Sequence, residues 1–215
     1  RFDTGLLRQI IANGLPAGFQ NSVISLANVV VQSNINRFGK MAMAGCGAYS
    51  KIEGFGFLPI TCFAMALTTF VSQNLGAGQY ERAKKGAAVG TISSMILAEL
   101  VGILYFIWAP YAMRIFVNAP EAIEFGVIHC RTTALFFFLL AFSHCAAGVM
   151  RGCGKSFMPM AAMLAFWCGV RILYVSIAIQ IVPVFQTISW AYPLTWFLSS
   201  VAFFVSLVRM DWKKL

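Results

Sequence analysis

The amino-acid sequence predicts an all-α, polytopic membrane protein built as a bundle of six transmembrane helices. The first observation behind this prediction is composition: 60% of the 215 residues are hydrophobic and only 11% are charged, with a mean hydropathy of +0.78. Soluble domains carry about 25% charged residues, so this chain lacks the polar surface that water requires. The second observation is six apolar segments of about 20 residues or more, the length at which a helix crosses a ~30 Å hydrocarbon core.

The first segment, residues 15–36, is unusually polar for a membrane helix. Asn21, Ser25, Asn28 and Gln32 follow one another at steps of four, three and four residues, which places them on one helical face. Lipid cannot satisfy polar groups, so this face must contact protein or water. Lining of a cavity and hydrogen bonding between helices both explain the pattern.

The second and third segments, residues 49–72 and 87–110, each carry an acid. Glu99 lies near the middle of the third segment, where a charge costs at least ~2.5–3.5 kcal/mol on insertion scales and normally faces a cavity or a partner. Glu99 is therefore a candidate for ion coupling, with a structural ion pair or a simply protonated acid as the alternative. Glu53 lies nearer the membrane interface and is a candidate for the cavity, or a solvated charge.

A polar stretch, residues 73–86, separates these two segments. Its glycines permit backbone conformations that other residues resist. Its amide side chains can bond the unpaired groups of the helix that ends and the helix that begins. Its basic residues place positive charge at a membrane boundary. The residues predicted to form the turn are Gln73, Asn74, Gly76, Gly78, Gln79 and Arg82.

The last three segments are residues 123–150, 157–182 and 189–208. The fourth carries His144, which we expect to pack inside the protein. The alternative is that its imidazole lies in a cavity and changes its protonation state there. The fifth carries Arg171 near its centre, at a depth similar to that of Glu99. Arg171 and His144 are therefore further candidates for ion coupling, and structural pairing is the competing explanation.

Several functional classes are disfavoured. The net charge of +9 does not predict nucleic-acid binding, because no basic stripe interleaved with aromatic residues lies outside the apolar segments. The stretch 152–156, Gly-Cys-Gly-Lys-Ser, mimics the end of a phosphate-binding loop, but Val149 stands where its first glycine belongs. No Ser/His/Asp or metal-ligand constellation converges at one depth, so neither an enzyme nor a bound cofactor is predicted.

The distribution of basic residues predicts the orientation in the plasma membrane. Six spans put both termini on one side, and the positive-inside rule makes that side the cytoplasm. Four basic residues lie opposite, at Arg37, Lys40, Lys51 and Arg114. The residues on the side of the termini are Arg1, Arg8, Arg82, Lys84, Lys85, Arg151, Lys155, Arg209, Lys213 and Lys214. A chain that opens on Arg1 without an initiator methionine is expected to be a fragment.

Residues 68–83 closely resemble the signature between the second and third helices of a bundle in MATE (multidrug and toxic compound extrusion) transporters. Residues 14–18, which open the first segment, the turn at 151–159 and the entry to the sixth segment at 190–196 are also similar to that family. Together, in this order, they make the chain resemble the carboxy-terminal six-helix lobe of a bacterial member.

The resemblance implies half of a secondary antiporter. MATE proteins have two six-helix lobes and export cationic or amphipathic drugs and toxic compounds in exchange for Na⁺ or H⁺, with no bound cofactor. The partners implied are membrane lipid, such small substrates, and the amino-terminal lobe, which is missing here, or a second copy of this chain. The residues that would then line the cavity are Gln20, Asn21, Asn28, Gln32 and Glu53.

The resemblance also bears on ion coupling. Some branches place coupling carboxylates on the first and fourth helices of this lobe, but the first-helix position here is Gln20 and no acid lies around Leu140. Coupling through acids of the missing lobe is therefore implied, with Glu53 and Glu99 as local candidates.

Two other hypotheses remain open. A lipid-linked oligosaccharide flippase of the same superfamily should have several basic residues that bind phosphate, whereas Arg131 and Arg171 are the only candidates within the segments. The second hypothesis is that the chain is a non-transporting membrane subunit or the remnant of a pseudogene.

Overall fold

The computed structural model of the protein describes residues 4–212. Within this range the regular secondary structure is helical and contains no strand, which confirms the predicted all-α fold. Arg1, Lys213 and Lys214, which were counted in the prediction of orientation, lie outside the described residues.

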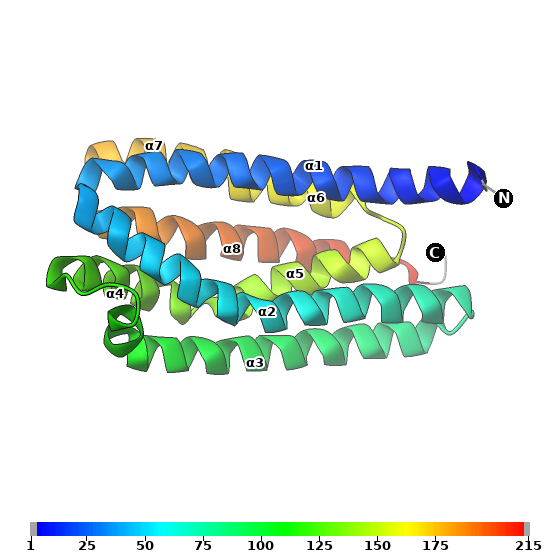
Figure 1. The fold of residues 1–215 in the computed structure, drawn as a ribbon. Helices are drawn as coiled ribbons and strands as arrows, with labels where there is room; N and C mark the ends of the chain where they lie inside the picture. Colours follow the sequence, from blue (N-terminus) through cyan, green and yellow to red (C-terminus); the bar gives the residue numbers. More distant parts are fainter. Residues whose placement is uncertain (1–3, 213–215) are drawn as a thin grey trace.

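The described chain folds into a bundle of helices. Its elements are α1 (Thr4–Ile35), η1 (Asn36–Phe38), α2 (Lys40–Gly76), α3 (Tyr80–Arg114), α4 (Pro120–Ala134), α5 (Phe137–Gly152), α6 (Phe157–Met163), the π-helix η2 (Leu164–Val170), α7 (Arg171–Ile181) and α8 (Phe185–Val208). Figure 1 shows α1 beside α6 and α7 on one side and α3 on the opposite side, with α5 and α8 between them. The α2–α3 turn, the α5–α6 loop and both ends of the described chain lie at one end of the bundle (Figure 1).

The helices differ in extent from the expected segments. α1 begins at Thr4 rather than at residue 15, and α2 begins at Lys40 rather than at residue 49. By length and hydropathy, α2, α3, the run from α6 to α7, and α8 suffice to cross a membrane, and α4 with α5 makes a fifth candidate. Of the six expected spans, the helix that is not among these candidates is α1, whose amide and hydroxyl side chains lower its hydropathy.

The single fourth segment expected from the sequence is two helices, α4 and α5, bent by 58° relative to one another. Just before the break, the hydroxyls of Thr132 and Thr133 donate to carbonyls one turn earlier, a contact that bends helices. Phe138 lies in the first turn of α5, where backbone amides lack partners within the helix. Glu99 Oε2, on α3, accepts the Phe138 amide at 3.2 Å and so caps α5 from a neighbouring helix.

The polar turn between α2 and α3 closes through the backbone. The Gln79 amide donates to the Asn74 carbonyl at 2.8 Å, and Gly78 has a φ of 71°, in the left-handed region that favours glycine. Of the two glycines singled out from the sequence, only Gly78 adopts such a conformation, because Gly76 is still in α2. Arg82 Nη1 donates to Gln79 Oε1 at 3.2 Å, which ties the start of α3 to the turn.

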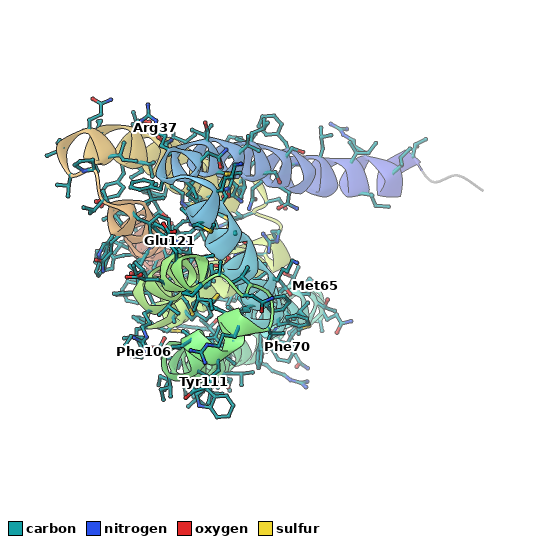
Figure 2. All side chains as sticks on the ribbon, turned by 60° about the vertical axis from the view of Figure 1, so that its left-hand side comes forward. Arg37, Met65, Phe70, Phe106, Tyr111 and Glu121 are labelled. Atoms are coloured by element: carbon teal, nitrogen blue, oxygen red, sulfur yellow. The ribbon has the colours of Figure 1, made fainter. Side chains whose placement is uncertain are left out.

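The outer surface of the bundle is apolar. On α3, Leu100, Trp108 and Tyr111 are exposed by 54%, 65% and 69%, and Tyr111 projects away from the helices in Figure 2. Soluble monomers rarely expose a continuous apolar surface of this kind, whereas it fits contact with lipid. Inside the bundle, small residues let helices approach: a Cβ on Gly148 of α5 would lie 2.5 Å from the Ala64 carbonyl oxygen on α2.

Candidate functional site

A cavity of about 600 Å³ lies among α1, α2, α5, η2, α7 and α8. Its walls combine aromatic rings with amides, hydroxyls and charged groups, an arrangement typical of small-molecule sites. The polar lining residues are Asn21, Ser25, Asn28, Ser50, Glu53, Thr61, His144, Arg151, Arg171 and Tyr192. Several side chains singled out separately in the sequence therefore meet at one place.

The polar face of α1 divides between the cavity and the protein. Asn21, Ser25 and Asn28 line the cavity. Gln20, which was also a candidate, is buried instead, and its Nε2 donates to the sulfur of Met163 on α6 at 2.7 Å. Gln32 is exposed and donates to the side chain of Asn36 at 3.2 Å, so it does not line the cavity. Of the four residues predicted to share this face, Asn21, Ser25 and Asn28 therefore line the cavity and Gln32 does not.

Glu53 reaches the cavity from α2, one turn after Tyr49. Tyr49 Oη donates to Glu53 Oε1 at 3.3 Å and lies 2.7 Å from Thr133 Oγ1 on α4. Thr133 Oγ1 in turn donates to the His129 carbonyl at 3.0 Å. An ionised Glu53 accepts from Tyr49, whereas a protonated Glu53 can donate to Tyr49, which then donates to Thr133. This hydrogen-bond chain connects the proton on Glu53 to α4 near its bend.

Arg171 begins α7, directly after the π-helix η2. Such π-helical segments are rare and occur frequently at functional sites. The guanidinium is almost completely buried, and its Nε and Nη2 both donate to Thr195 Oγ1, at 3.2 and 2.8 Å. Its Cζ lies 4.4 Å from the ring centroid of Tyr192 and 5.4 Å from that of Trp167. These cation–π contacts hold the charge in place against the cavity wall.

His144 and Arg151 line the cavity from α5. The imidazole of His144 packs edge-on against Phe57 and Trp167, with ring centroids 4.8 and 5.3 Å apart. Its Nε2 is buried and has no hydrogen-bond partner among the described residues. Buried polar atoms are normally paired, so this unpaired nitrogen is an exception in the cavity wall.

Glu99 and Arg131 lie elsewhere in the bundle. Glu99 is half-buried on α3 and bonds the amide of Phe138, and it does not line the cavity. Arg131 is exposed on α4, where its Nε donates to the Phe106 carbonyl at 3.3 Å and its Cζ lies 5.5 Å from the Phe106 ring centroid. The structure therefore does not bring Glu99 together with Arg171, His144 or Glu53.

Sequence reasoning missed several residues of this site. Arg151 was counted only among the basic residues that predict the orientation, and Tyr49 and Thr133 were not singled out. Trp167 carried one usable signal, since it precedes Arg171 by one helical turn and both face the cavity. Tyr192 and Trp196, which line the cavity, belong to the stretch 190–196 that was noted for its resemblance to MATE proteins. No group of three or more potential metal ligands occurs in the described residues.

Comparison with known proteins places these features in context. The MatE family model matches residues 16–177. A Thermotoga maritima protein described as "Probable multidrug resistance protein NorM" is 28% identical over 161 residues, which are 74% of this chain and 35% of that protein. A Bacillus subtilis protein described as "Probable multidrug resistance protein YpnP" is 24% identical over 159 residues, 74% of this chain and 36% of that protein.

A solved structure shares the fold. It is a multidrug resistance MATE family transporter of the MOP superfamily in an outward-facing conformation. The superposition has a TM-score of 0.86 at 20% identity and covers 95% of this chain and 46% of that one. The chain thus spans little more than a third of the curated relatives and less than half of this transporter.

Proposed function

The chain belongs to the MatE family, and from this premise we propose that it forms one lobe of a secondary active transporter that exports amphipathic compounds in exchange for Na⁺ or H⁺. The family match confirms the predicted resemblance, and membership of a transporter family agrees with the prediction that the chain is not an enzyme. The chain is a multi-pass membrane protein.

One observation carries the proposal: the cavity that places Glu53 and Arg171 inside an otherwise apolar membrane bundle. Ionisable side chains within membrane segments are costly and usually mark substrate or ion pathways. Here a carboxylate, a guanidinium and an imidazole converge on one space large enough for a small molecule. Transport needs such a space, and packing alone does not account for it.

The working transporter needs a second lobe. The solved transporter is about twice as long as this chain, which covers 46% of it. We propose that a second six-helix lobe, or a second copy of this chain, faces α1 and α2 across the cavity. Alternating access would then arise as the two lobes rock against each other, with both termini in the cytoplasm of a plasma-membrane protein.

Within this lobe, Glu53 is the acid placed to couple an ion to transport. It lines the cavity and ends the hydrogen-bond chain through Tyr49 to α4. Glu99 caps the bend at the start of α5, so we assign it a structural role. Arg171 and His144 face the same cavity as Glu53 and are proposed to bind substrate beside it. The turn that contains Gln79 and Arg82 is proposed to stabilise the cytoplasmic end as the lobes move.

The test is dye efflux from drug-sensitive cells that express the protein containing this chain. A panel of fluorescent amphipathic compounds, ethidium included, is loaded and its efflux is followed before and after ionophores dissipate the Na⁺ and H⁺ gradients. We expect efflux of at least one compound to stop when one gradient collapses. Efflux of none of them, at normal membrane levels, would contradict the proposed function.

Two variants locate the coupling acid. Glu53→Gln removes the charge that faces the cavity, and Glu99→Gln is its matched control because the amide keeps an oxygen for the Phe138 amide. We expect Glu53→Gln to lower gradient-driven efflux at least about tenfold, within the range of typical coupling free energies, and Glu99→Gln to leave it within about twofold. The reverse result would place coupling at Glu99 and contradict the assignment.

One observation supports the alternative that the protein is a lipid-linked oligosaccharide flippase. Arg151 and Arg171 both line the cavity, although Arg131, the other candidate from the sequence, is on the exposed side of α4. Two arginines in one cavity can bind a phosphate group. Transfer of a fluorescent lipid-linked phosphosugar by reconstituted protein, without efflux of soluble dyes, would favour that function. A non-transporting subunit would show neither activity.

A further inference from the structure

The charges that face the cavity are predominantly positive. Arg151 and Arg171 line it, and Glu53 is the one acid among its described lining residues. A concave site with two guanidinium groups and one carboxylate attracts an anionic group more strongly than a cationic one.

The guanidinium of Arg171 has hydrogen-bond donors to spare. Its five N–H groups cannot all be satisfied by one hydroxyl oxygen, and Thr195 Oγ1 is its hydrogen-bond acceptor in the described chain. Arg171 and Glu53 face the same cavity but form no salt bridge with each other. A guanidinium that is only 2% exposed and has no hydrogen-bonded carboxylate is costly, so an oxyanion bound to its remaining donors would add to the compensation that Glu53 supplies electrostatically.

The geometry of the site also selects the kind of anion. The planar fork of an arginine matches the paired oxygens of a carboxylate or a phosphate. Thr195, Tyr192 and Trp167 fix the orientation of the Arg171 fork by hydrogen bonds and ring contacts. A guanidinium fixed in this way loses little freedom when it binds a ligand, so the bound anion gains affinity.

Aromatic rings surround the charged end of the cavity. Phe57, Trp167, Tyr192 and Trp196 all line it, and Trp167 and Tyr192 contact the guanidinium itself. Flat apolar walls of this kind pack favourably against another ring. The cavity volume of about 600 Å³ lies within the ~300–1,000 Å³ range of sites for drug-sized ligands.

Resting on the proposed function, we propose that this cavity takes aromatic oxyanions, compounds in which a carboxylate or phosphate is attached to a ring system. The oxyanion binds Arg171, Arg151 adds a second positive charge to the lining of the same cavity, and the ring packs among the aromatic side chains. This substrate class differs from the cationic compounds that the family resemblance implies.

The first test compares ligands that differ in charge. The protein containing this chain is purified into lipid nanodiscs, and the binding of 2-naphthoate, 2-naphthyl phosphate and 2-naphthylmethylammonium is measured by calorimetry. We expect at least one anion to bind about tenfold or more tightly than the ammonium, as charge-assisted bonds to a fixed fork provide. The anion that binds more tightly identifies the oxyanion. Equal or tighter binding of the ammonium overturns the proposal.

The second test compares two arginines. Arg171→Gln should lower the affinity for the preferred anion about tenfold or more and leave the ammonium nearly unchanged, because it removes a charge-assisted bond. Arg131→Gln is the matched control, since it removes an arginine from the exposed side of α4, and it should bind as wild type does. Loss of anion affinity in both variants, or in neither, overturns the assignment to Arg171. Should Arg171→Gln fail to fold, Arg171→Lys keeps the charge without the fork and should lose most of the preference.

These outcomes separate the inference from the function on which it rests. Gradient-driven efflux without any preference for anions overturns the inference and leaves the transporter. A preference for anions in a protein that moves no compound overturns the proposed transport and leaves an anion site in the lobe.

Discussion

On two faces of the bundle an acid and an arginine within the apolar segments can be compared, and their surroundings are opposite. On the cavity face, Glu53 and Arg171 line a common space and contact the hydroxyls of Tyr49 and Thr195. On the α3–α4 face, Glu99 and Arg131 bond backbone groups, the Phe138 amide and the Phe106 carbonyl.

The two surroundings show two ways in which a membrane protein accommodates charges that are costly in lipid. A charge within the apolar bundle needs a compensating partner. On the α3–α4 face backbone groups supply it: Glu99 caps the start of α5 at the bend, and Arg131 bonds a carbonyl of α3. On the cavity face the side chains are only partly paired, and for this reason we propose that they bind an ion or a substrate.

The largest expected difference between the two faces is access to water. In a variant without its native cysteines, Ser25→Cys places a thiol in the cavity, and Leu100→Cys places one beside Glu99 on the apolar outer surface. We expect a charged, membrane-impermeant maleimide to label the first at least about tenfold faster, because the reactive thiolate is disfavoured in lipid. Labelling is followed by mass spectrometry in proteoliposomes, and equal rates would contradict a water-filled cavity.

A second expected difference is structural. Glu99→Leu removes the acceptor of the Phe138 amide and should destabilise the protein by about 1 kcal/mol, the usual cost of a lost helix cap. Glu99→Gln keeps an oxygen at that place and is the control. Thermal unfolding in detergent measures both variants. Equal melting temperatures for Glu99→Leu and the wild type would show that the cap contributes nothing to the bend.

The smallest expected effect concerns the link between Glu53 and α4. Tyr49→Phe keeps the ring that packs on His129 but removes the hydroxyl between Glu53 and Thr133. A net hydrogen bond contributes about 1 kcal/mol, so we expect the initial rate of efflux to fall about two- to fivefold at unchanged membrane levels. A rate equal to that of the wild type would mean that the hydrogen-bond chain takes no part in transport.

Composition and periodicity predicted the class of fold because they depend directly on whether water or lipid surrounds the chain. A chain with 11% charged residues cannot present a soluble surface, and apolar segments of membrane length form helices because lipid offers no partner to the backbone. The helical period also grouped Asn21, Ser25 and Asn28 on one face, and the structure places all three on the cavity.

The bend between α4 and α5 and the meeting of Glu53, Arg171 and His144 depend on contacts between distant parts of the chain. The depth of a residue along a helix can be counted from the sequence. By depth alone, Glu99 and Arg171 were equally good candidates for ion coupling. Which way a side chain faces depends on how the helices pack, since rotation about a helix axis is set by neighbouring side chains. That packing turned Glu99 toward the start of α5 and turned Arg171 toward the cavity.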